Sequence, residues 1–403
     1  KRVEFALDEV NSVYLNDTIK LINIGVSSVA SRYNKLAGAK SLIKHARLLN
    51  GREVLSSMRY ANRYLAFQEF NRPNAVNMSV KQWEARSQNG YKLEADGADY
   101  IINYTDVLAE NRTTDSQTTT LGGCVYLSEL FPILRNPEFI LHTGLFKNLR
   151  VEIEYEEHLT TVLQHNNVGP MITMTPQIVY DTVVDKDDFD ALTNQAMSMS
   201  FQFSEIEHDQ FIVNHKDAAA GSTTGEKQIV DVKLNAFDNK FINRMLISKA
   251  YRQNNRYESG VNVKGAGVLG SVACFRETYQ FSINNKQILP DGGWDKENTV
   301  QANLIDVYGE CNNWGASSSY AWAGAANDYA DVNASGTGSW VGLQVGDLVK
   351  NFSMTYGRTV LDDNAVAPLP RKGNEELTVH VYAETQRQMM VSNGRYEIVN
   401  VSV

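Results

Sequence analysis

The chain has 403 residues, a formal net charge of −9 and 43% hydrophobic residues. This length is more than one hydrophobic core usually serves, so two domains are expected. The acidic balance argues against a protein that coats nucleic acid through its bulk surface, because phosphate binding needs clustered Lys and Arg. No apolar run approaches the ~20 residues of a membrane-spanning helix. Three cysteines, Cys124, Cys274 and Cys311, cannot complete a disulfide framework and are expected to be reduced and mostly buried.

The first residues carry an apolar stripe at helical spacing, formed by Val3, Leu7, Val10 and Tyr14. This spacing predicts a short helical arm over residues 1–17. Two placements are open for the arm: packing on its own domain, or reaching a neighbouring subunit or a surface beneath.

The next part of the chain is predicted to form strands over 18–24 and 41–49. Asn50 and Gly51 then predict a tight turn, because both residue types tolerate positive φ. A helix is predicted from Ser57 to about residue 70, where Pro73 would prevent its continuation.

Residues 148–203 carry the strongest pattern in the chain. Every second residue from Leu149 to Tyr155 is apolar, which is typical of a strand with one face in a core and one in water. A strand over 178–184, an acidic helix that begins near Asp185 and a strand over 197–203 are predicted to follow. Aspartates suit the positive end of a helix dipole.

Residues 215–227 are rich in small residues and lack large apolar ones, which is typical of a linker. The predicted plan is therefore the arm, a first domain over 18–214, the linker, and a second domain over 228–403. The second domain is predicted to contain one helix, which ends near Gly309. Its predicted strands cover 229–234, 237–250, 279–283, 341–356, 377–383 and 396–403.

A weak repeat relates the two halves. Leu49–Leu55 matches Ile283–Leu289 in residue character, and Leu149–Ile153 matches Leu377–Val381 at a similar separation. Two all-β units of ~200 residues with a helix between early strands predict two packed β-sandwiches of related topology. We therefore predict an all-β fold of two consecutive eight-stranded jelly rolls, with a few short helices and long loops, since jelly rolls protect strand edges. Chance similarity of two β-domains is the alternative.

In the order and spacing of its segments, the chain resembles the double jelly-roll major capsid proteins of double-stranded DNA viruses, the lineage of tectiviruses, adenovirus, Polinton-like elements and large algal viruses. The resemblance covers most of the chain, although the longer insertions of the large algal-virus members are lacking. The similar segments are Leu49–Phe70, Val125–Pro132, Ile178–Phe203, Leu377–Glu384 and Gly394–Ile398.

The resemblance implies a structural protein and not an enzyme. Three subunits would form a homotrimeric, pseudo-hexagonal capsomer of an icosahedral shell, assembled inside the host cell and located in the virion. The implied partners are the chain itself, neighbouring capsomers, penton and minor capsid proteins, and an internal membrane near the arm over 1–17. Sequence-specific nucleic-acid binding is not expected. Aromatics in 312–340, and the Thr-rich loop over 111–120, fall where such proteins carry insertions, and a trimer contact is favoured for the aromatics.

No catalytic, cofactor-binding or metal-binding residue is assigned, and no cofactor is expected. Glu156 and Glu157 are adjacent on a predicted strand and would point to opposite faces, so they do not form a glycosidase pair. The acidic cluster of Asp185, Asp187 and Asp188 is explained as a solvated helix start. The histidines His142, His158 and His165 lack the i, i+4 spacing of a helical zinc pair.

A different class of function is the alternative: a β-sandwich protein that binds or cleaves carbohydrate. The polar stretch 312–340 contains Trp314, Trp322 and Trp340, which could form a sugar platform. In that case, Trp322→Ala should abolish glycan affinity, whereas a capsid protein should have no such affinity to lose.

Overall fold

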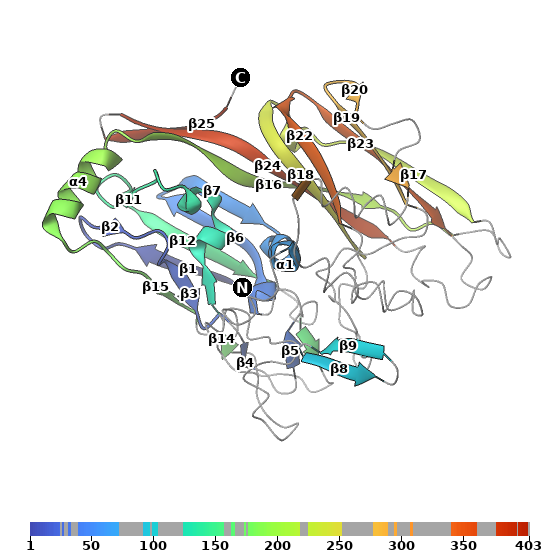
Figure 1. Cartoon of the computed structure of the whole chain (residues 1–403), viewed down its shortest axis with the longest axis horizontal. Coiled ribbons are helices and arrows are strands. Elements are labelled where there is room, and N and C mark those ends of the chain that lie inside the picture. Colours follow the sequence, from blue (N-terminus) through green and yellow to red (C-terminus); the bar gives the residue numbers. More distant parts are fainter. Residues whose placement is uncertain are drawn as a thin grey trace.

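The computed structural model contains two β-rich units side by side, crossed by two long strands (Figure 1). It describes residues 1–24, 26–27, 31–33, 39–71, 92–96, 99–103, 124–156, 163–165, 173–174, 176–217, 225–251, 277–288, 294–295, 307–308, 340–360, 376–392 and 394–401.

The first unit is built around a four-stranded antiparallel sheet. Its order is β1 (Arg2–Leu7), β12 (Leu149–Tyr155), β6 (Ile43–Asn50) and β7 (Glu53–Arg59). The predicted alternation in β12 is confirmed, because Leu149, Val151, Ile153 and Tyr155 are all buried. Their side chains form one face of a core that the rest of the unit covers.

The helical prediction for the first residues is wrong, because residues 2–7 form edge strand β1. Val3 lies opposite Ile153, and Phe5 opposite Val151. Phe5 explains the error. On a helix it would lie opposite the Val3–Leu7 stripe and face water, whereas on a strand Val3, Phe5 and Leu7 share the inner face. A strand over these residues therefore buries more apolar surface than a helix would.

Short strand pairs and helices complete the first unit. The strand groups are β10 (Cys124–Tyr126) with β3 (Lys20–Ile22) and β15 (Gln177–Val179), β11 (Leu141–His142) with β2 (Val13–Tyr14), β13 (Leu163–His165) with β5 (Ser31–Tyr33), β14 (Thr173–Met174) with β4 (Val26–Ser27), and β8 (Lys92–Asp96) with β9 (Asp99–Asn103). The helices are η1 (Ala39–Leu42), α1 (Ala61–Asn71), α3 (Leu127–Leu130), η2 (Pro132–Arg135) and α4 (Lys186–Ala196).

Helix α1 begins later than predicted, because residues 53–59 pair with β6 as strand β7. The turn at Gly51, with φ +62°, folds this segment back onto β6 and places Leu55 and Met58 in the core. Sheet pairing thus overrides local helix propensity there. The chain then turns at Tyr60, which has an unusual φ of +49°.

The acidic helix start is confirmed. The carboxylate of Asp185 accepts hydrogen bonds from the backbone N–H groups of Asp187 and Asp188, at 3.0 and 3.1 Å, and so caps α4. These bonds satisfy two donors that have no partner within the helix.

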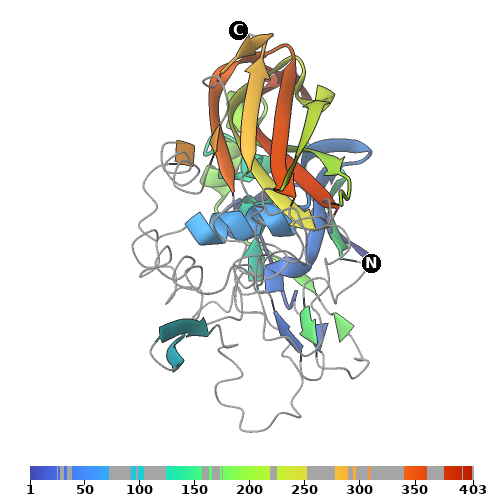
Figure 2. The ribbon, with the colours of Figure 1, turned by 90° about the vertical axis from the view of Figure 1, so that its right-hand side faces the viewer.

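The second unit contains a sheet with the same strand order. This sheet runs β17 (Glu226–Lys233), β23 (Phe352–Val360), β19 (Thr278–Ile283) and β20 (Lys286–Gln287), and β21 (Trp294–Asp295) also pairs with β19. Hairpin β19–β20 corresponds to hairpin β6–β7, as the first sequence match predicts, and its turn residues Asn284 and Asn285 both have positive φ. Figure 2 shows these strands standing over α1.

The second sequence match is wrong. In the sheet, the strand that takes the place of β12 is β23, whereas residues 377–381 belong to the unrelated position of β24 (Leu377–Ser392). The error has a simple cause: alternation is common to all half-buried strands and does not report which strand they pair with.

Two long strands connect the units. β16 (Ser200–Val213) pairs with β24 over the whole length of β16. On the other side of β24 the sheet continues through β18 (Lys240–Tyr251) to β22 (Val341–Val349), and β25 (Arg395–Asn400) pairs with the C-terminal end of β24. The short helix η4 (Asn235–Phe237) precedes β18. Phe201 and Met389 lie in the first core, and Phe211 and Leu377 in the second. We call this β16–β24 pair the shared ribbon. Packing therefore does not divide the chain into two consecutive bodies, because β24 and β25 return to the first core.

Candidate functional site

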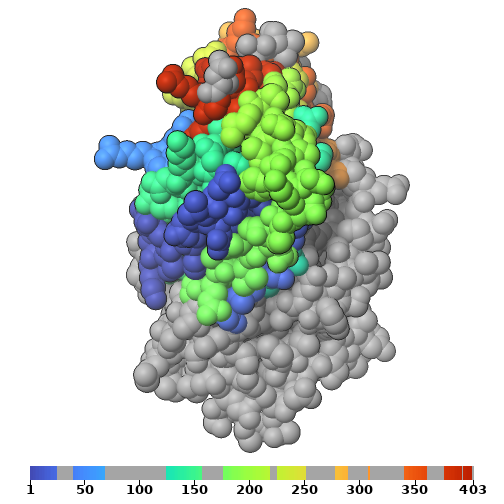
Figure 3. All heavy atoms as spheres, turned by 90° about the vertical axis from the view of Figure 1, so that its left-hand side faces the viewer, coloured from blue at the N-terminus to red at the C-terminus, as the bar shows by residue number. Residues whose placement is uncertain are grey.

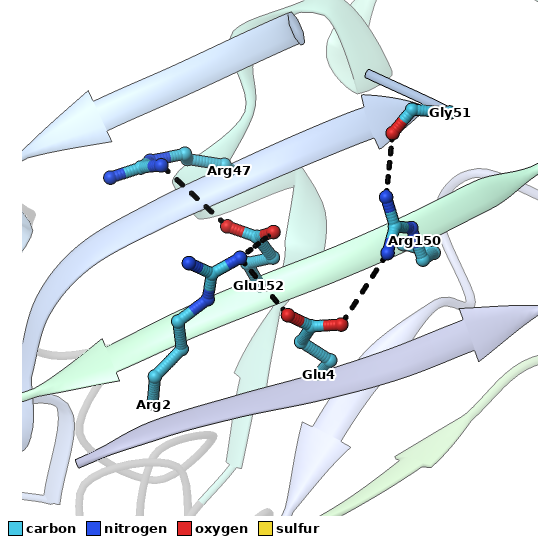
Figure 4. Close-up of polar contacts among 6 residues, drawn as sticks. All are labelled: Arg2, Glu4, Arg47, Gly51, Arg150 and Glu152. Atoms are coloured by element: carbon cyan, nitrogen blue, oxygen red, sulfur yellow. Dashed lines mark hydrogen bonds and ion pairs between the residues drawn. The ribbon is translucent and has the colours of Figure 1, made fainter. Parts of the chain in front are cut away.

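The outer face of the first sheet carries a ladder of alternating charges (Figure 4). Arg2 on β1 contacts Glu4 at 3.0 Å and also Glu152 on β12. Arg47 on β6 approaches the other oxygen of Glu152 at 3.7 Å. Only 8% of the Glu152 side chain is exposed, so two guanidinium groups compensate a largely desolvated carboxylate.

Arg150 extends the ladder towards the hairpin. It approaches Glu4 at 3.5 Å and donates to the carbonyl oxygen of Gly51 at 2.6 Å. The ladder thus ties β1 to β12, β6 and the β6–β7 turn. Of the two placements open for the first residues, the structure shows residues 2–7 packed on their own unit.

A histidine–tyrosine cluster lies where the first unit meets the shared ribbon. The rings of His45, His208 and His380 lie 5.0, 4.8 and 4.9 Å from the ring of Tyr60. Nε2 of His208 lies 3.0 Å from Nδ1 of His380, and the hydroxyl of Tyr382 donates to the carbonyl oxygen of Tyr60 at 3.0 Å. The hydrogen bond from Tyr382 therefore holds the strained Tyr60 backbone from the ribbon side.

The cluster holds its histidines neutral. Burial lowers the pKa of His208 to about 3, helped by the positive charges of Arg59 and Arg63 and by the nearby titratable ring of His45. The pKa of His380 is well below its ordinary value, chiefly through burial and then through Arg63. Desolvation penalises the charged imidazolium, and the neighbouring cations add to the penalty.

Glu205 is a buried carboxylate on β16, next to hairpin β6–β7. Its Oε1 accepts from the hydroxyl of Ser56 at 3.0 Å and from the backbone N–H of Ser57 at 2.8 Å. Burial raises the pKa of Glu205 to about 7, although these two donors oppose the shift. This group connects the ribbon to β7 and changes charge near neutral pH.

Trp340 does not form a sugar platform. Its side chain is fully buried, and its ring lies 5.6 Å from that of Phe67 on α1. Phe67 also contacts Tyr308 at 4.9 Å, and the guanidinium of Arg244 lies 4.5 Å over the Tyr308 ring. Trp340 therefore belongs to the contact between α1 and the second unit. The other predicted platform residues, Trp314 and Trp322, and the loop over 111–120 lie outside the described residues.

Two of the residues considered as site candidates from the sequence, His142 and Glu156, make hydrogen bonds within the fold. His142 accepts from the N–H of Gly144 at 2.8 Å, and its Nε2 lies 3.1 Å from the Thr193 hydroxyl. Glu156 accepts from the Asn62 amide at 2.8 Å. His165 lies on β13, whereas Glu157 and His158 lie outside the described residues.

Within the described ranges, no three or more His, Cys, Asp or Glu side chains are grouped so that they could hold a metal ion. No helix in the described part of the chain is both long and apolar enough to cross a membrane. Cys124 is buried in β10, and Cys274 and Cys311 lie outside the described ranges.

Sequence reasoning missed the histidine–tyrosine cluster. His208 and His380 are 172 residues apart, and His45 and Tyr60 come from yet another region. No local motif contains these residues. One local signal was His380, which interrupts the apolar alternation at the start of β24, whereas the neighbours of His208 in the chain are polar.

Comparisons with known proteins bear on the fold. No protein-family model matches the chain, and no curated protein matches it. Among solved structures, the PBCV-1 virus capsid has a TM-score of 0.56 at 8% identity, covering 100% of this chain and 93% of that one. The Faustovirus major capsid protein has a TM-score of 0.55 at 7% identity, covering 97% and 88%. The mavirus major capsid protein has a TM-score of 0.50 at 9% identity, covering 99% and 87%.

Proposed function

We propose that this chain, which has the all-β double jelly-roll fold of these capsid proteins, is itself the major capsid protein of a double-stranded DNA virus. The fold prediction is confirmed by likeness over nearly the whole chain and by the repeated sheet order. The observation that carries the proposal is this whole-length match, because a protein that shared only one roll would match only part of these chains. Its role is structural and its location is the virion.

The repeated sheet order supports a pseudo-hexagonal trimer. One subunit carries the order β1-β12-β6-β7 and the order β17-β23-β19-β20, with the shared ribbon fixing one unit against the other. Three such subunits around one axis present six similar walls, which suits a hexagonally tiled shell. Homotrimer formation and contacts with other capsomers follow from this arrangement.

An exposed apolar region is suited to contacts between capsomers. Val10 and Val184 are 89% and 91% exposed, on segments joined by the hydrogen bond from Val183 N–H to the Val13 carbonyl oxygen. Figure 3 shows these N-terminal and central segments side by side on one face. Asp8 and Glu9 flank Val10, and their charges disfavour an anionic membrane surface. We therefore assign this region to contacts with neighbouring capsomers or with minor capsid proteins.

The oligomer is tested by light scattering on the purified protein with negative-stain images of the same fraction. We expect a mass about three times the 45.1 kDa of the chain and a hexagonal outline. A monomer at micromolar concentration would contradict the proposal.

The assembly region is tested by Val184→Asp, with Val184→Thr as the matched control of similar size. The aspartate should leave the trimer intact and reduce shell formation, because it places a charge in an apolar contact. Unchanged shell yield for the aspartate variant would exclude this region from assembly.

A further inference from the structure

The rings of His208 and His380 contact Tyr60 and so join the shared ribbon to the first unit. We propose that this contact is an acid-operated latch: protonation of both histidines separates the ribbon from Tyr60 and α1. The proposal concerns the chain's own conformation and does not depend on the capsid function.

The geometry allows the pair one shared hydrogen bond. Nε2 of His208 and Nδ1 of His380 are 3.0 Å apart, so one nitrogen must donate a proton and the other must accept it. A first extra proton can be taken up by the outer nitrogen of the donating ring, which leaves this hydrogen bond intact. When both rings are protonated, the two facing nitrogens each carry an N–H group, and these groups point at each other. The pair must then break its contact, because it cannot keep this separation with both nitrogens protonated.

The surroundings give a protonated His380 little compensation, whereas His208 is partly exposed. The ring faces are covered by Tyr60 and Tyr382, at 4.8 to 4.9 Å. His380 is only 2% exposed, so water does not solvate its charge. An imidazolium in this position would lose its hydration without gaining an anionic partner.

The charged groups that face the cluster are mostly positive. Arg59 from β7 and Arg63 from α1 act on the pair, and His45 from β6 is a third titratable ring. Around His45 itself, the cations Lys44, Arg47 and Arg59 oppose protonation and the carboxylate Glu154 favours it, while Glu156 acts on Arg63. The carboxylates thus lie towards His45 and Arg63, and among the residues that the structure describes the charges acting on His208 and His380 are positive.

The contact occupies a position from which it can affect both units. Tyr60 is the residue of positive φ between β7 and α1, and its carbonyl oxygen is held by Tyr382 of the ribbon. Loss of the histidine contact would release a strained turn. Helix α1 carries Phe67, which packs against Trp340 of the second unit. An opening at Tyr60 would therefore loosen the packing between the two units.

The test compares the full chain with a His208→Gln, His380→Gln double variant by hydrogen–deuterium exchange from pH 7.5 to 5.0. Glutamine can keep a hydrogen bond but does not titrate in this range. In the wild type, the opening constant of peptides covering α1 and the middle of β24 should rise by up to about 100-fold per pH unit below ~6.5, tenfold for each histidine. The double variant should lose this rise. His215→Gln is the matched control, since His215 is exposed beside Asp217, and it should keep the rise.

Equal pH dependence in the wild type and the double variant would overturn the proposal. A second measurement covers the case in which the double variant does not fold: deuterium exchange at the imidazole carbon of each histidine, read by mass spectrometry in the wild type. Titration of His208 and His380 near ~6.5 with no change in α1 exchange would equally overturn the latch.

Discussion

The two sheets of identical strand order differ most on their outer faces. In the first sheet, β1, β12 and β6 present a ladder in which Arg2, Glu152 and Arg47 alternate in sign across the strands. In the second, the outward positions of the central strands β23 and β19 are uncharged, namely Ser353, Thr355, Gly357, Thr359, Thr278, Gln280 and Ser282. Its outward charges lie on edge strand β17, at Lys227, Asp231 and Lys233. The inward positions of both sheets are mostly apolar, with the buried Arg358 of β23 as an exception.

This difference shows which residues specify the topology and which remain available for contacts. Inward residues such as Ile153 and Met354 set the register, because a one-residue slip would turn them to water. Outward residues are under no such constraint. One subunit can therefore present two walls of the same shape and different chemistry, which suits alternating positions around a pseudo-sixfold axis.

The largest expected effect comes from matched core substitutions, Ile153→Ala in β12 and Met354→Ala in β23. Each side chain is nearly inaccessible, and each substitution should cost about 2–5 kcal/mol. Because the shared ribbon has one end in each core, both variants should shift a single unfolding transition. Two separate transitions in urea, each moved by only one variant, would show that the units are independent.

The next effect concerns Glu205, which lies on the ribbon between the two units. Burial raises its folded pKa to about 7, above the ordinary value of 4.5, so its contribution to stability is complete below ~4.5 and is lost as pH rises through ~7. Glu205→Gln should therefore be more stable than the wild type by about 2–3 kcal/mol at pH 8 and nearly equal to it at pH 4.5. Urea unfolding across this range measures the difference, and a constant difference would contradict the assignment.

A smaller effect should separate the two outer faces. Glu152→Ala should cost about 1–2 kcal/mol, because it leaves Arg2 and Arg47 without their shared partner. Asp231→Ala removes only an exposed hydrogen bond from Thr355 and should cost less than about 0.5 kcal/mol. Thermal unfolding at low and high salt measures both. Equal costs would show that the ladder does not stabilise the first sheet.

The smallest effects concern the two hairpin turns. Gly51 has φ +62°, so Gly51→Ala should destabilise by about 1 kcal/mol. Asn285 has φ +63°, and Asn285→Gly should change stability by only a few tenths of a kcal/mol, since both residue types accept this conformation. Thermal unfolding of the two variants provides the comparison. A large loss for Asn285→Gly would indicate a contact of its side chain rather than a backbone preference.

Patterns within one segment were predictable from the sequence. The alternation of β12, the aspartate cap of α4 and the turn at Asn50 and Gly51 each depend on a few neighbouring residues. The fold class followed from their order and repetition. The strand at residues 2–7 was not found, because the stripe of Val3 and Leu7 fits both periods and Phe5 received no weight.

Features that depend on distant pairing were not predictable. The length of the shared ribbon reflects 14-residue pairing between β16 and β24, which the sequence does not encode locally. Trp340 looked exposed because its neighbours in the chain are polar, yet α1 covers it. The histidine–tyrosine cluster combines residues from four elements, and only the tertiary fold brings them together.

The most direct test of the account is a cryo-EM reconstruction of the purified oligomer at a resolution that separates strands. We predict three copies of the chain, with the β1-β12-β6-β7 and β17-β23-β19-β20 sheets alternating at six similar positions around the threefold axis. The charged ladder across β1, β12 and β6 and the uncharged central strands β23 and β19 would then distinguish neighbouring positions. An oligomer in which the two sheets lie at different radii, or a chain that stays monomeric, would contradict the central claim.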